Sequence, residues 1–171
     1  MTIGQVFLKE VDAELNASRP LLERVPSDKV RWKPHQKSSP LGHLTQLVCR
    51  MPKVMSDIVK GIDLDLAAGP GYSFETTEVM LREFDANVAE VKATLTAATD
   101  ADFDGTWSVR NGADIYDTSR RGDALRNTIN HFVHHRGQLT VYLRLLDVPI
   151  PQLLYGPTAD EKEIAVTSKA G

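Results

Sequence analysis

Apolar residues recur three and four positions apart along most of the chain, which is the spacing of amphipathic α-helices. The clearest run predicts a helix with five apolar side chains on its inward face: Leu81, Phe84, Val88, Val91 and Leu95. This alternation is typical of the seam of a helix bundle, so we expect these side chains to lie in a common core.

The preceding part of the chain predicts two more helices. The first covers about residues 3–25, and Pro20 should kink or divide it. Ser39 and Pro40 resemble a helix N-cap followed by a first-turn proline. They begin a second helix, in which Pro52 is expected to introduce a kink. One broad apolar face of this helix includes Leu44, Leu47, Val48, Met51, Met55, Ile58 and Val59. The stretch "GIDLDLAAGPGYS" (61–73) is a long connection to the third helix.

The pattern changes after the third helix. The stretch "TWSVRNGADIYDTSRR" (106–121) predicts two short extended pieces around Asn111-Gly112, a dipeptide typical of hairpin turns. A fourth helix then runs to about Leu146, where "DVPIP" ends it. We therefore predict the all-α class. The expected fold is a four-helix bundle in a single domain, residues 1–171, with a small hairpin excursion before the fourth helix and a polar tail over about residues 161–171.

Composition narrows the functional classes. The 171 residues are 42% hydrophobic and 25% charged, as expected of a soluble globular domain. The net charge is −3 without a long basic stripe, so nucleic acid is not an expected partner. No apolar run is long enough to span a bilayer, and the N-terminal stretch lacks the apolar core of a signal peptide. Cys49 is the single cysteine, which is compatible with a reducing compartment, and we expect a cytoplasmic protein.

Three of the five histidines fall in "HFVHH", residues 131–135. His131 and His135 are four apart and share one helix face, but His134 also lies one turn from His131, so spacing alone offers two pairs. Orientation separates them. At roughly 100° per residue, His135 lies about 50° from the centre of the apolar face, His131 about 90° and His134 about 150°. His131 and His135 are therefore the preferred pair, and His134 should point outward.

Such a pair is able to chelate a divalent metal, with zinc or nickel as the expected ions, because neutral imidazole is a good ligand for both. A catalytic site usually needs a third protein ligand, and His43, near the start of the second helix, is the candidate. The alternative is that all three histidines are ordinary residues at the edge of the core. Gln138 and Tyr142 follow on the fourth helix as candidates for orienting a substrate, although Tyr142 equally suits core packing. Arg136 is expected on the helix surface or at an interface.

The stretch "NHFVHHRGQLTVYLRLLDVPIPQLLYGPTADE" (130–161), with its "H-x-x-x-H-R-G-Q-L" block, resembles the DinB/YfiT-like family of damage-inducible four-helix proteins. The segments "RWKPHQKSSPLGHL" and "TWSVRNG" are similar to that family as well, so the resemblance covers nearly the whole chain. It implies an up-down-down-up bundle with a long crossing connection. It also implies a metal bound by three histidines, two of which fall on His131 and His135. The third falls on Leu47, which cannot ligate a metal, whereas His43 lies one turn earlier.

Two functions follow from this resemblance. In the first, His43, His131 and His135 hold a divalent metal in a hydrolase or a transferase that uses a low-molecular-weight thiol, with an unidentified small molecule as substrate. In the second, the metal site is degenerate and the bundle binds a small molecule or a partner without catalysis. A homodimer is plausible in either case because bundle faces with surplus apolar residues often pair.

Overall fold

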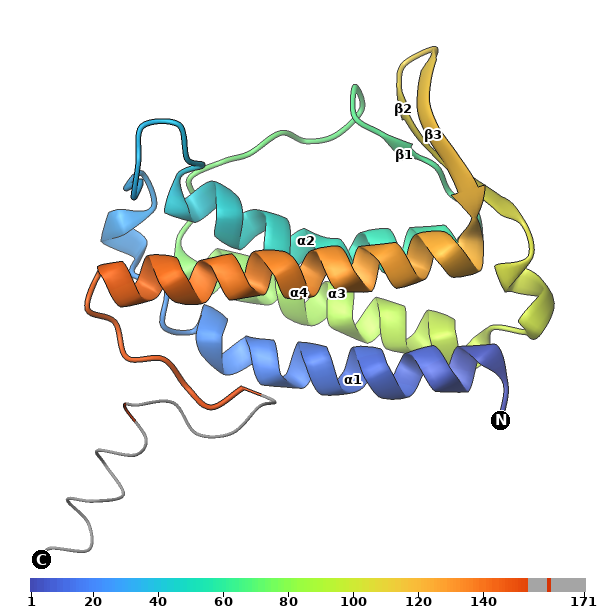
Figure 1. Cartoon of the computed structure of the whole chain (residues 1–171), viewed down its shortest axis with the longest axis horizontal. Helices are drawn as coiled ribbons and strands as arrows, with labels where there is room; N and C mark the ends of the chain where they lie inside the picture. The colour runs from blue at the N-terminus through green and yellow to red at the C-terminus, as the bar shows by residue number, and fades with distance from the viewer. Residues whose placement is uncertain (154–159, 161–171) are drawn as a thin grey trace, which may run out of the picture.

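The computed structural model describes residues 1–153 and 160, and four α-helices make up most of this part of the chain (Figure 1). They are α1 (Ile3–Leu22), α2 (Leu41–Lys60), α3 (Thr77–Ala97) and α4 (Arg121–Leu145). Single 3-10 turns follow α1 and α3, at η1 (Ser27–Lys29) and η2 (Asp100–Phe103). The predicted polar tail over about residues 161–171 lies outside the described residues.

Local signals set several helix ends. Thr2 caps α1 in a reciprocal capping box with Gln5, which satisfies two backbone N–H groups at the helix start. Thr76 caps α3 by accepting a hydrogen bond from the backbone N–H of Val79. Gly61 ends α2 in the left-handed region, at φ 73°, where a side chain would be strained. Neither proline divides its helix, because Pro20 lies inside α1 and Pro52 lies inside α2.

The core lies between the four helices, with α2 packed against both α3 and α4 and with α1 packed mainly against α3. Of the five seam residues predicted in the third helix, Phe84, Val91 and Leu95 are buried, while Leu81 and Val88 pack half-buried against the same core. The periodicity therefore identifies the inward face of α3.

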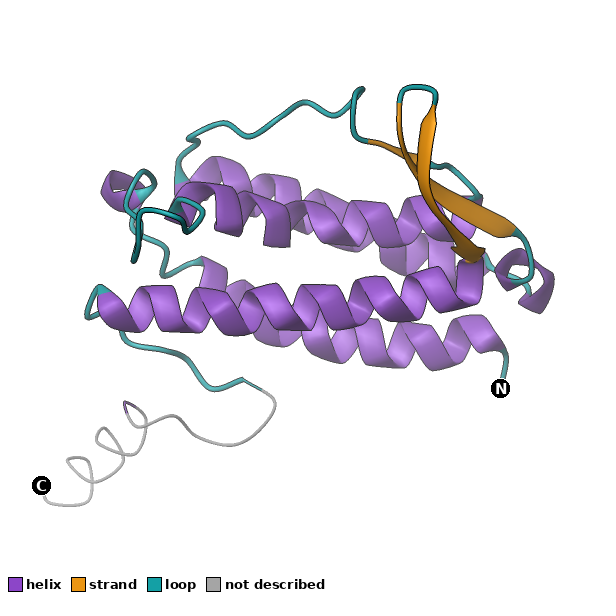
Figure 2. Cartoon of the chain, turned by 45° about the horizontal axis from the view of Figure 1, so that its top comes forward, coloured by secondary structure: helices purple, strands orange, loops and turns teal. Residues whose placement is uncertain are grey.

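A small three-stranded sheet lies at one end of the bundle (Figure 2). The antiparallel strands β2 (Thr106–Asn111) and β3 (Asp114–Arg120) form the predicted hairpin, with Gly112 at φ 62° in its turn. The third strand, β1 (Leu64–Asp65), pairs in parallel with β2 and is not predicted by the sequence pattern. The prediction of an all-α class is corrected by this sheet, although the helical bundle remains the body of the molecule.

The long connection between α2 and α3 is attached to the bundle near both of its ends. Close to the start of α3, the amide of Gln46 exchanges hydrogen bonds with the backbone N–H and the hydroxyl of Ser73. Just after α2, the indole Nε1 of Trp107 donates to the carbonyl of Ile62 at 2.8 Å. The second contact also anchors the sheet above the bundle. None of the helices in the described residues has the length and apolar character needed to cross a membrane.

Candidate functional site

A cavity of about 320 Å³, which we call the hairpin cavity, lies between the sheet and the helices α2 and α4. Most of its wall is apolar, and a few polar groups come from β3 and α4. Its lining residues are Leu47, Met51 and Val54 of α2, Leu64 of β1, Trp107 and Val109 of β2, Asp117 and Ser119 of β3, and Ala124, Asn127, Thr128 and His131 of α4. A mostly apolar wall with few polar groups is the usual make-up of a small-molecule site.

Strand register explains which hairpin side chains enter this wall. Trp107 is opposite Ser119, and Val109 is opposite Asp117, so all four side chains point to the same face of the ladder. The register shifts immediately beyond this point, between Val109 and Arg110. The hairpin therefore presents one indole, one aliphatic group, one hydroxyl and one carboxylate toward the helices.

A second cavity of about 310 Å³, which we call the histidine cavity, lies further along α4 toward its C-terminus. It is lined by Ser38, Ser39, His43, Leu44, Leu47, Tyr72, His135, Gln138 and Tyr142. His131 and His135 thus belong to adjacent cavities, and Leu47 is common to both. His134 lines neither of these two cavities; His134 and His131 are both exposed, whereas His135 is half-buried.

The two preferred histidines are in direct contact. The Nε2 atoms of His131 and His135 are 2.6 Å apart, and Nδ1 of His135 lies 2.8 Å from Oε1 of Gln138. An amide oxygen only accepts, so Nδ1 of His135 carries the hydrogen, and in the neutral ring Nε2 is then an acceptor. If both rings are neutral and the Gln138 amide has this orientation, His131 donates from its own Nε2 and its Nδ1 is an acceptor.

The surroundings favour neutral imidazoles. The pKa of His131 is lowered, first because burial removes water from part of its ring and then because His135 and His134 lie nearby. The pKa of His43 is also lowered, mainly by burial and further by the positive charges of Lys33 and Arg31. A neutral ring is the form that can accept a hydrogen bond or bind a metal.

His43 is held in an aromatic stack and does not join the histidine pair. Its ring stacks on Tyr72 and Phe74, with centroid separations of 5.0 and 4.6 Å, and Arg31 covers the far face of Phe74. Its Nε2 atom is buried without a hydrogen-bond partner. The structure therefore brings His43 and His135 into one cavity, but His43 serves there as part of a packed stack.

These donors do not fit a three-histidine metal centre. Within residues 1–153 and 160, no three histidine, cysteine, aspartate or glutamate side chains are grouped closely enough to hold an ion. Catalytic zinc sites generally use three protein ligands. Leu47 lies on α2 beside both members of the pair, and it offers no donor atom. The site therefore has two converging imidazoles and lacks the third ligand.

The two predicted substrate-orienting residues differ in their environment. Gln138 is exposed in the histidine cavity and fixes the orientation of His135. Tyr142 is half-buried, packs edge-on against Trp32 and donates from its hydroxyl to the carbonyl of Ser39 at 3.2 Å. Tyr142 thus links the segment before α2 to α4, and its hydroxyl already donates a hydrogen bond within the protein.

The sequence predicts Arg136 as an ion-pair residue on the helix surface or at an interface. It does form an ion pair, but it is buried between two helices and does not lie on the surface. Arg136 is 3% exposed and forms an ion pair with Glu14 of α1, with 2.5 Å between Nη1 and Oε2. Its Nη1 also donates to the carbonyl of Glu14 and to the hydroxyl of Ser18. Arg136 therefore belongs to the buried face of α4, together with Phe132 and Leu139. The sequence held a signal for it, which is that Arg136 lies four residues after Phe132 and three before Leu139, on the apolar seam of α4.

Comparison with known proteins identifies similar folds. The model of the DinB family matches residues 4–164. A crystal structure of a DinB-like protein from Bacillus cereus superposes with a TM-score of 0.67 at 19% identity, covering 86% of this chain and 95% of that one. A DinB-like protein from Bacillus subtilis, YjoA, gives a TM-score of 0.64 at 16% identity, covering 90% of this chain and 98% of that one. At these identities the structures show a common fold. No curated protein matches the chain.

Proposed function

Since the chain belongs to the DinB family, and since its third metal-donor position holds Leu47, we propose that it is a small-molecule-binding bundle with a degenerate, two-histidine metal site. The observation that carries the proposal is the hairpin cavity. An apolar wall there meets the imidazole of His131 and a few polar groups from β3 and α4. A ligand with an apolar body and a hydrogen-bond donor matches both features.

The same proposal includes the up-down-down-up order of the helices. Gln46, near the start of α2, bonds Ser73 just before α3, while Trp107, soon after α3, bonds Ile62 just after α2. Both contacts support a parallel course of α2 and α3, which requires a long crossing connection between them. Figure 1 shows this connection passing over the bundle from the sheet end back to the start of α3.

Filling the hairpin cavity from the strand side should abolish binding. The chain has two tryptophans, so in a Trp32→Phe background the emission of Trp107 reports on the cavity it lines. We expect 1-hexanol to shift this emission and a Val109→Phe substitution to weaken its binding by about tenfold or more, because the larger ring occupies the apolar space. Ile115→Phe, on an exposed position of the same hairpin, is the matched control and should bind as the parent does. Equal affinity in the two variants would refute binding at this place.

A second candidate is a metal-dependent hydrolase or thiol-dependent transferase with His43, His131 and His135 around zinc or nickel. One observation favours it, namely that Nε2 of His43 is buried without a partner in the cavity that also contains His135. A divalent metal in such a site would lower the pKa of a bound water or thiol. The stack of His43 between Tyr72 and Phe74 and the leucine at position 47 argue for the degenerate site.

Removing the His43 ring separates the two candidates. We expect His43→Ala to leave the affinity for zinc or nickel, measured by calorimetric titration, within about twofold of the parent, because a two-histidine site does not use it. His131→Ala with His135→Ala should remove the remaining weak binding. His134→Ala is the matched control on the exposed side of α4. A tenfold loss of affinity in His43→Ala would establish His43 as a ligand and support the enzyme.

A cytoplasmic location and a homodimer complete the proposal. Cys49 is a free, buried thiol, which is compatible with a reducing compartment. Val141 and Leu145 are exposed apolar residues one turn apart on α4, and they support pairing of two copies through this helix.

A further inference from the structure

We propose that the hairpin cavity recognises molecules with a cationic group, such as an ammonium, at the end of an apolar body, and that Asp117 is the residue that selects the charge. The inference rests on the proposed small-molecule function and names its ligand class. It follows from the charge of the cavity wall, from the freedom of the Asp117 carboxylate and from the apolar surface beside it.

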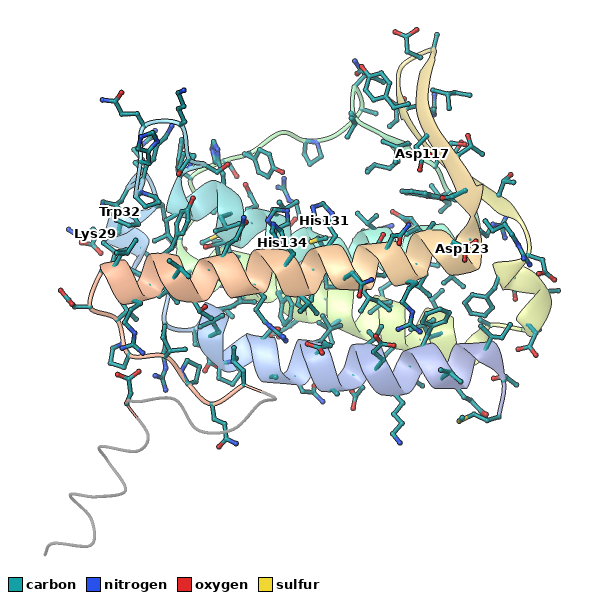
Figure 3. The ribbon with its side chains drawn as sticks, viewed as in Figure 1. Lys29, Trp32, Asp117, Asp123, His131 and His134 are labelled. Carbon is teal, nitrogen blue, oxygen red and sulfur yellow. The ribbon has the colours of Figure 1, made fainter. Side chains whose placement is uncertain are left out.

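The wall carries one acidic group. Among its twelve lining residues, Asp117 is the only aspartate or glutamate, and no lysine or arginine is present. Figure 3 shows Asp117 on β3, on the side of the cavity opposite the α4 helix that carries His131. A ligand entering between these elements therefore meets a carboxylate from the sheet and an imidazole from the helix.

Asp117 is an exposed residue of the cavity wall, and its carboxylate has no internal partner. In the described part of the chain it makes no hydrogen bond or ion pair, and its cross-strand neighbour is the apolar Val109. The hairpin arginines are already engaged, since Arg110 pairs with Asp65 and Arg120 pairs with Asp104. An available carboxylate beside an apolar wall is a site for a cation, because pairing there gains a charge-assisted hydrogen bond.

The apolar part of the wall suits the rest of such a ligand. Met51, Val54 and Leu64 offer aliphatic surface, and Trp107 adds an indole that is largely buried. An aromatic ring close to a carboxylate strengthens the preference for a cation, because the ring face is electronegative. A neutral ligand of the same shape would reduce the hydration of Asp117 without pairing it, and an anionic ligand would be repelled.

Three probes of equal chain length separate charge from apolar contact. In the Trp32→Phe background, Trp107 emission is followed during titration with n-hexylammonium, 1-hexanol and hexanoate at low ionic strength. We expect n-hexylammonium to bind about five- to tenfold more tightly than 1-hexanol, and hexanoate to bind most weakly. Asp117→Asn should remove the preference for n-hexylammonium over 1-hexanol, mainly by weakening the binding of n-hexylammonium, because the amide keeps the shape and removes the charge.

Asp114→Asn provides the matched control, since it removes one negative charge from the same strand at a residue that does not line this cavity. It should preserve the preference for n-hexylammonium. Equal binding of n-hexylammonium and 1-hexanol by the parent, or an equal loss in the two asparagine variants, would overturn the inference while leaving small-molecule binding intact. Failure of all three probes to bind would overturn the inference and the proposed function together.

Discussion

Replacing Leu47 by histidine should convert the two-histidine site into a metal site that binds zinc or nickel about a hundredfold or more tightly than the parent. Leu47 lines the hairpin cavity with His131 and the histidine cavity with His135, so a ring at this position joins the pair from the facing helix. Three imidazoles on two rigid helices complete the usual protein ligand set of a catalytic zinc. Removing a residue that merely hydrogen-bonds to a metal ligand typically lowers metal affinity by about 10- to 100-fold. Adding a ligand that binds the metal directly should therefore raise the affinity by at least as large a factor.

Calorimetric titration with zinc chloride or nickel chloride measures this gain. Val54→His is the matched control, because it adds an imidazole to the same helix beside His131 but outside the histidine cavity. Val54→His should raise the affinity for zinc or nickel much less than Leu47→His does. Adding His131→Ala to the Leu47→His variant should cancel the gain. A Leu47→His variant with parental affinity would show that the pair is not oriented toward α2 for ligation.

Breaking the buried pair of Arg136 and Glu14 should cost more stability than breaking a solvent-exposed ion pair of the same bundle. Arg136→Met removes the cation but keeps an apolar stem, and it leaves the Glu14 carboxylate buried without its partner. Stranding a buried charge typically costs about 3–5 kcal/mol, so we expect a loss of this size in the free energy of unfolding. The double variant Glu14→Leu/Arg136→Met should recover most of it, because neither charge then remains.

Urea unfolding measures the free energy of unfolding of the parent, Glu14→Leu, Arg136→Met and the double variant. These four values form a double-mutant cycle. A second ion pair between the same two helices supplies the comparison: Arg126 and Glu10 are considerably more exposed. Arg126→Met should cost about 1 kcal/mol or less. If the two arginine variants were equally stable, the Arg136 pair would not behave as a buried one.

Much of the fold is accessible from sequence because its signals are local. The seam of α3, the hairpin at Asn111-Gly112 and the end of α4 each depend on a few neighbouring residues. The sequence pattern does not predict β1 because this strand has only two residues. They form a strand only by pairing with β2, which is distant in sequence. Pro20 is expected to kink or divide the first helix, yet α1 continues through it, because a proline costs helix stability without dictating where the helix ends.

The candidate site is predictable only in part. Periodicity places His131 and His135 together, and the structure shows their contact, but their role as ligands stays a prediction. The environment of His43 depends on Tyr72 and Phe74, which come from a connection without helical periodicity. Asp117 could not be identified either, because strand register and the cavity beneath it decide which hairpin residues face the helices.

Leu47 lines both the hairpin cavity and the histidine cavity, so we expect binding in the two cavities to be coupled. A ligand in the hairpin cavity that displaced this side chain toward the histidine cavity would reduce the space there. Two small molecules bound on opposite sides would then oppose one another without touching. Thermodynamic linkage requires that each weaken the other by the same factor. Through Leu47, binding in either cavity would then lower the affinity of the other cavity for its ligand.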